Sequence, residues 1–196
     1  MRYTRIPETA FQNLQLNAGV LLSDFDPAAG TVEEADIMGA TSGGVAFAAT
    51  PEFSDFGEDI DNCPVNVLEL KRLDSWEVTM SGTFITVSTT LVKDLIGAAD
   101  IAATKVVPRN DVATTDFKDI WWVGDYSDKN GETKGGFVAI HMLNGLSTGG
   151  FQLQSGNREK GQFEFEFTGH YSINAQNTVP FEVYVKAGTD EEEAGG

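Results

Sequence analysis

The segment GQFEFEFTGHYS, residues 161–172, constrains the fold most, because its side chains alternate between apolar and polar. Successive side chains of an extended strand point to opposite faces of a sheet. The apolar set of this strand is Phe163, Phe165, Phe167 and Tyr171, and the opposite set is Glu164, Glu166, Thr168 and His170. The pattern therefore predicts a strand that covers a core with one face and displays two carboxylates on the other.

Length and charge narrow the class of protein. The chain has 196 residues, with 30 Asp and Glu against 13 Lys and Arg, which gives a formal charge of −17. We expect a single domain over residues 1–188 and an acidic, flexible tail over residues 189–196. Binding to nucleic-acid phosphates requires clustered Lys and Arg, and the nearest approach to a cluster is the pair Lys71 and Arg72. The composition therefore argues against specific nucleic-acid binding.

Cysteine usage and hydropathy indicate the compartment. Cys63 is the only cysteine, so an intrachain disulfide is impossible and the zinc patterns that need cysteine pairs are absent. The N-terminal segment has two arginines but no continuous apolar stretch, which argues against a secretory signal. No segment approaches the roughly 20 apolar residues of a membrane helix. We expect a protein that is made and first assembled in a cytoplasm, without membrane insertion.

The hydrophobic pattern predicts a mainly β protein with one short helix. Strands are expected at residues 14–22, 43–50, 76–88, 117–125, 136–142, 150–154, 162–171 and 180–187. Residues 89–99 instead place apolar side chains at helical spacing after a Ser/Thr cap, which predicts an amphipathic helix. The dipeptide Asn130-Gly131 is a strong hairpin signal, so the second half is expected to be an antiparallel meander.

Residues 51–66 are both acidic and aromatic, with prolines at positions 51 and 64. A loop of this length is uncommon unless it has a function. The large apolar side chains of Phe53, Phe56 and Ile60 would contribute no burial if they faced solvent. We interpret this long loop as a projecting arm that packs on another copy of the chain. The alternative, in which these side chains fold back onto their own core, remains open at this point.

Candidate chemistry is sparse. His141 and His170 lie in separate predicted strands without the flanking residues of a metal or acid–base site. The acidic cluster at Glu58, Asp59 and Asp61 does not fit a calcium loop and is interpreted as turn residues. A glycosidase would need a supported carboxylate pair, and Trp121 and Trp122 are expected on opposite faces of one strand. No phosphate-binding or nucleophile motif is present. The sequence predicts a non-enzyme without cofactor or metal.

Several segments along nearly the whole chain resemble the major tail tube proteins of long-tailed bacteriophages, of the kind found in phages and prophages of Gram-positive hosts. The resemblance is carried by FQNLQLNAGVLL from Phe11, IMGATSGGVAF from Ile37, PEFSDFGEDIDNCP from Pro51, LDSWEVTMSGTF from Leu73, DIWWVGDYS from Asp119, GGFVAIH from Gly135 and PFEVYVKAG from Pro180. Their order and coverage carry the resemblance, because none of these motifs is diagnostic alone.

The resemblance implies a fold of two packed antiparallel sheets with a flanking helix and a long projecting loop. It further implies six copies per ring and rings that stack into a hollow tail tube, which forms part of the virion after assembly in the bacterial cytoplasm. The implied partners are further copies of the chain, the tail tip or initiator complex, the tail terminator and the tape measure protein in the lumen. Genomic DNA would pass through this lumen without specific binding.

An acidic wall would repel DNA phosphates and let the genome slide. We therefore assign lumen charge to Glu164 and Glu166, and more weakly to Glu77 and Glu182, because these residues lie off the core in predicted strands. The predicted contacts between rings are Phe53, Phe56 and Ile60 of the arm, with the N-terminal segment near Phe11 as a second contact.

Two other readings remain. A tube from a contractile tail or a phage-like bacteriocin would share the fold and need a surrounding sheath. A β-sandwich carbohydrate-binding module or adhesin would instead use an exposed aromatic face, and saturable glycan binding by a monomer would identify it. A glycoside hydrolase is set aside for lack of a supported acid–base pair.

Overall fold

The computed structural model describes residues 6–7, 10–126 and 135–188. Its strands are β1 (Gln15–Leu22), β2 (Ile37–Gly39), β3 (Thr41–Asp55), β4 (Lys71–Phe84), β5 (Ala99–Ala102), β6 (Lys105–Pro108), β7 (Lys118–Tyr126), β8 (Gly136–Ser147), β9 (Phe163–Thr168) and β10 (Phe181–Lys186). The α-helix is α1 (Thr89–Ile96), and short 3-10 turns occupy Ala10–Asn13, Glu34–Asp36, Leu68–Leu70 and Thr114–Asp116.

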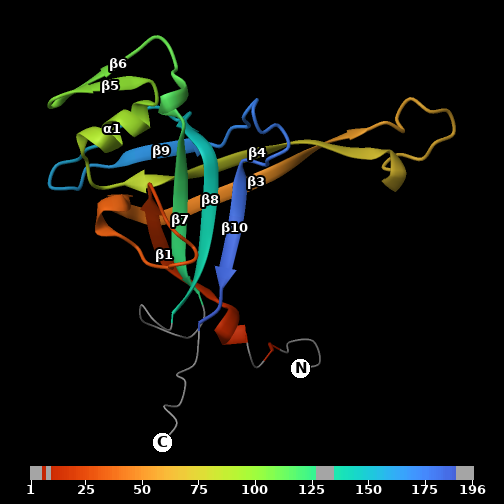
Figure 1. The fold of residues 1–196 in the computed structure, drawn as a ribbon, viewed down its shortest axis with the longest axis horizontal. Helices are drawn as coiled ribbons and strands as arrows, with labels where there is room; N and C mark the ends of the chain where they lie inside the picture. The colour runs from red at the N-terminus through yellow and green to blue at the C-terminus, as the bar shows by residue number, and fades with distance from the viewer. Residues whose placement is uncertain (1–5, 8–9, 127–134, 189–196) are drawn as a thin grey trace, which may run out of the picture.

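The main strands form two antiparallel sheets that cross and share β8 (Figure 1). One sheet has the order β2-β1-β7-β8-β10, and the other has the order β8-β9-β4-β3. The separate ribbon of β5 and β6 lies beside α1 (Figure 1). The predicted class, mainly β with two packed antiparallel sheets and one helix, is therefore confirmed. The predicted tail at residues 189–196 and the hairpin signal at Asn130-Gly131 lie outside the described residues.

The two sheets meet at a corner in β8. Its first part pairs with β7 and β10, whereas Leu146 and Ser147 pair with β9. Close to this boundary Asn144 has a φ of 49°, a left-handed conformation that asparagine tolerates better than most residues. The Asn144 backbone N–H donates to Asp119, and its side-chain amide donates to the His170 carbonyl, both at 3.0 Å. These bonds hold the residue that turns the strand from one sheet into the other.

Two apolar clusters stabilise the sheets from opposite sides of β7. The larger lies between the sheets and combines the apolar faces of β4 and β9 with Leu91 and Leu95 of α1. The smaller lies on the other face of β7, where Phe25 packs edge-on against Trp121 and Phe137. Trp122 belongs to the first cluster and Trp121 to the second, so the prediction that they face opposite ways is confirmed.

The helix begins and ends at residues that the sequence marks. The Ser88 hydroxyl accepts the Leu91 backbone N–H at 3.1 Å, which satisfies one of the free N–H groups of the first turn. The helix ends at Ile96 and not at residue 99, because Gly97 has a φ of 81° and closes the last turn.

Some strand predictions are wrong in detail. Residues 150–154 form no strand and contribute only an isolated bridge from Gln154 to Gln162. The first strand is interrupted, because Asn17 and Gly19 have positive φ and break the pairing of β1 with β7. β9 ends at Thr168, and the exposed side chain of Tyr171 instead accepts a hydrogen bond from the Trp76 backbone N–H.

Candidate functional site

One face of the β3-β4-β9 sheet carries only small, polar and acidic side chains. The register places Glu164 opposite Thr83, Glu166 opposite Ser81, and Thr168 opposite Thr79. On the other side of β4, Glu77 lies opposite Thr50. We call this surface the acidic face, and it consists of Ala46, Ala48, Thr50, Glu52, Ser75, Glu77, Thr79, Ser81, Thr83, Glu164, Glu166 and Thr168. It contains no Lys, no Arg and no large apolar residue.

The carboxylates of the acidic face are exposed, and two of them accept hydrogen bonds from hydroxyl groups. The Ser75 hydroxyl donates to Glu52 at 2.7 Å, and the Thr148 hydroxyl donates to Glu166 at 3.2 Å. Within the described part of the chain, no ion pair neutralises Glu164, Glu166 or Glu77. The opposite face of the same strands packs Phe163, Phe165 and Phe167 into the core at 8%, 3% and 2% exposure, as the alternation predicts.

Glu182 lies elsewhere. It belongs to β10 in the other sheet, where it pairs with His141 and accepts the Tyr184 hydroxyl at 2.5 Å. This hydrogen bond to a carboxylate, together with burial, raises the pKa of Tyr184. The structure therefore brings together three of the four predicted lumen carboxylates and separates Glu182 from them.

The predicted arm is the outer half of a long β3–β4 hairpin that projects from the body (Figure 1). Pro51 lies within β3, which Pro can join because β3 is an edge strand. Beyond Pro51 the large side chains are open to solvent: Phe53 is 53% exposed, Phe56 is 58% and Ile60 is 49%. They do not fold back onto their own core, so this alternative from the sequence is wrong. Phe11 lies in the turn Ala10–Asn13, and the surroundings of its side chain are outside the described structure.

Asp55 organises the end of the arm. Its carboxylate accepts the backbone N–H groups of Gly57 and Asn66 at 2.9 and 2.8 Å. These two hydrogen bonds, with a smaller contribution from the Lys71 ammonium, hold the pKa of Asp55 below its usual range. Lys71 also donates to the Asn66 side chain at 3.2 Å and lies 5.1 Å from the centre of the Phe53 ring. The loop at the tip of the arm therefore has a defined conformation although its apolar side chains are exposed.

A side-chain cluster around His141 was missed by sequence reasoning. The imidazole stacks on Trp121 with ring centres 3.8 Å apart, and its Nε2 lies 3.2 Å from Asp119. Its Nδ1 lies 3.7 Å from Glu182. The available signal was the spacing of Asp119 and Trp121 on one strand, but recognising the cluster required the β7–β8 register that pairs Trp121 with His141. His170 is separate and contacts the Asn144 carbonyl and the edge of Phe117.

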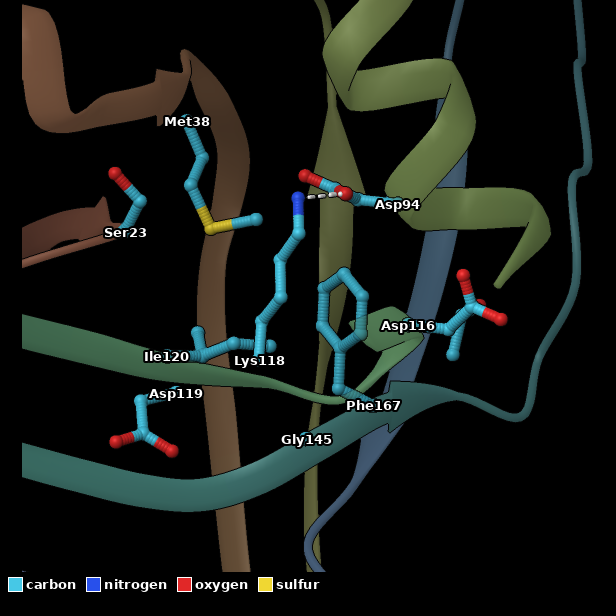
Figure 2. Close-up of a pocket in the computed structure, with 10 residues that line it drawn as sticks. Ser23, Met38, Asp94, Asp116, Lys118, Asp119, Ile120, Gly145 and Phe167 are labelled. Atoms are coloured by element: carbon cyan, nitrogen blue, oxygen red, sulfur yellow. Dashed lines mark hydrogen bonds and ion pairs between the residues drawn. The ribbon is translucent and has the colours of Figure 1, made fainter. Parts of the chain in front are cut away.

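The cavity between α1 and the sheets is small and structural. Figure 2 shows Lys118 reaching across it to Asp94, and the ammonium and carboxylate are 2.5 Å apart. The space open to the centre of a water molecule is about 20 Å³, which is enough for about one water. Next to it, Asp116 is buried. Burial raises its pKa, but hydrogen bonds from the Ala113 N–H and the Arg109 guanidinium outweigh this and leave the pKa lowered.

Among the residues described, no group of three or more His, Cys, Asp or Glu side chains is arranged to hold a metal ion. Within the same residues, no helix has the length and apolar character needed to cross a membrane. No protein-family model matches the sequence, and no curated protein matches it either.

Proposed function

We propose that this chain is the structural subunit of a hollow phage tail tube, in which hexameric rings stack and DNA passes through the lumen. The observation that carries the proposal is the acidic face, which combines uncompensated carboxylates with small hydroxyl side chains and lacks cations. Such a wall repels phosphates and offers no large apolar side chain on which bases could stack. The resemblance of the sequence to tail tube proteins supports the same function.

In this proposal Glu164, Glu166 and Glu77 line the lumen, and the exposed residues of the arm connect successive rings. A sheet face with this composition is unsuited to a carbohydrate-binding role, which requires exposed aromatic rings. The two adjacent tryptophans are 6% and 9% exposed, so neither offers such a platform. No specific observation favours the glycan-binding alternative.

Negative-stain electron microscopy tests the proposal most directly. The purified protein at high concentration, and particles from its source, should show rings or hollow tubes with sixfold end views. A persistent monomer in both settings would remove the tube function and make glycan screening the next experiment.

Charge reversal on the acidic face tests the lumen assignment. Glu164→Lys with Glu166→Lys should leave tubes intact but slow or trap DNA ejection, because lysines would attract the passing phosphates. The measurement is ejection kinetics from assembled particles. Glu33→Lys with Glu34→Lys, in the exposed segment before β2, is the control with the same charge change. Ejection that is unchanged in the acidic-face variant would show that the acidic face lies outside the lumen.

A further inference from the structure

The tip of the arm presents an apolar and acidic surface with no cover. We call residues 56–70 the tip loop. Its side chains Phe56, Ile60, Val65 and Leu68 are 58%, 49%, 73% and 83% exposed. The tip loop also contains four carboxylates and no Lys or Arg. A grouped set of exposed apolar side chains on a projecting element is typical of an interaction surface.

The outer half of the hairpin has little support from the rest of the chain. β9 pairs with β4 only from Thr79 to Phe84, and the last contact along that edge is the hydrogen bond from the Trp76 N–H to Tyr171. From Ser75 outward the arm is a two-stranded ribbon. Such a ribbon is marginally stable by itself in water. The arm therefore gains stability if its tip binds another surface.

A surface of complementary character lies at the opposite end of the same sheet. Phe84 at the inner end of β4 pairs with Phe163 at the start of β9. The segment that leads into Phe163, residues 150–162, consequently lies at the end of the sheet remote from the arm (Figure 1). We call this segment the β9 loop.

The β9 loop is apolar and cationic. Phe151 and Leu153 are 42% and 55% exposed. Arg158 and Lys160 are also exposed, and neither forms an ion pair with any residue that the structure describes. The one carboxylate of the loop, Glu159, lies against Gly156 of the same loop. In a chain with a net charge of −17, this loop thus has more positive than negative groups.

We propose that the tip loop of one copy docks on the β9 loop of the next copy. Phe56 and Ile60 pack against Phe151 and Leu153, while Glu58, Asp59 and Asp61 face Arg158 and Lys160. Because the two surfaces differ and lie at opposite ends of the molecule, the contact is head-to-tail and repeats from copy to copy. The inference rests on the proposed tube function and specifies the surface that receives the arm.

Charge reversal with rescue tests this contact. The tip variant carries Glu58→Lys, Asp59→Lys and Asp61→Lys; the loop variant carries Arg158→Glu and Lys160→Glu; and a combined variant carries all five changes. Each of the first two should reduce the fraction of protein that pellets as tubes by about tenfold or more, because like charges then face each other across the contact. The combined variant should restore tubes, because attraction returns with opposite sign. Lys105→Glu with Lys186→Glu is a control that matches the charge change of the loop variant.

The outcomes separate this contact from the tube function. Melting temperatures equal to the wild type would show that the variants are folded, since surface substitutions change stability little. The contact would be overturned by wild-type levels of tubes in both single-surface variants, or by no recovery in the combined variant. In either case, tubes formed by the wild type would still support the proposed function. Absence of rings and tubes from the wild type, both purified and in source particles, would overturn both.

Discussion

The inner and outer halves of the β3–β4 hairpin are one continuous ribbon with opposite surroundings. In the inner half, Val78, Met80 and Phe84 are completely buried between the two sheets. In the outer half, Phe53 and Leu73 lie opposite each other and remain 53% and 44% exposed. The inner half is stabilised by contacts within the chain, whereas the outer half has apolar side chains whose burial requires another molecule. The apolar side chains of the inner half thus stabilise the fold, and in the proposed tube those of the outer half would stabilise the assembly.

The largest expected effect is the loss of tubes in the double variant Phe53→Ser with Phe56→Ser, which changes only the outer half of the hairpin. Both side chains are about half exposed, so the free energy of unfolding of the monomer should fall by only about 2 kcal/mol. Long tubes should nevertheless be lost, because the arm loses its apolar contact with the next ring. Electron microscopy and chemical denaturation of the same preparation measure the two effects. Long tubes of wild-type abundance would identify the arm as an ordinary surface loop.

A core substitution in the inner half should give the opposite result. Phe84 is fully buried, with its ring centre 4.6 Å from that of Phe165. Phe84→Ala should lower the free energy of unfolding by about 4 kcal/mol, from lost burial and the cavity left behind. Chemical denaturation measures this loss. Phe84→Leu keeps most of the volume and should cost about 1 kcal/mol; equal losses in the two variants would contradict the packing argument.

The smallest expected effect is the pH dependence that the Asp55 carboxylate gives to the conformation of the tip loop. Since hydrogen bonds lower the pKa of Asp55 in the folded arm, its stabilising contribution is present above the ordinary carboxyl pKa and is lost as pH falls through the lower folded value. NMR should show the amides of Gly57 and Asn66 shifting together with an Asp55 titration below the usual carboxyl range. Asp55→Asn should abolish this linked change, whereas Glu58→Gln should preserve it. An Asp55 titration at the ordinary position would contradict the assignment.

Local patterns predict the parts of the fold that depend on periodicity. The buried faces of β9, the opposite orientation of Trp121 and Trp122, and the helix after Ser88 all follow from spacing and capping. The error at residues 150–154 has a different origin. Phe151 and Leu153 alternate like strand residues, but only Gln154 forms a bridge, because no neighbouring strand is positioned to pair with them. Pairing depends on the tertiary structure, which the alternation of one segment does not contain.

The candidate site also combines features that are predictable from one strand with features that depend on the tertiary structure. The off-core positions of Glu164 and Glu166 are readable from one strand. Their association with Glu77 and the separation of Glu182 require the strand order, which places β4 beside β9 and β10 beside β8. The clustering of His141, Asp119 and Glu182 likewise depends on three strands meeting in register. Short-range sequence features define faces, whereas the assembly of faces into a site depends on topology.

A small rotation at the corner near Asn144 would produce a larger displacement at the far end of the β3–β4 hairpin. The sheets cross near Thr79 of β4, which pairs through Thr168 with Leu146 of β8. At a rise of about 3.3 Å per residue, β4 extends roughly 26 Å from there to its outer end at Lys71. A rotation of about 5° there would displace the outer end of β4 by roughly 2 Å, about half of one strand spacing. We expect the curvature of any polymer built through the end of the hairpin to be sensitive to substitution of Asn144.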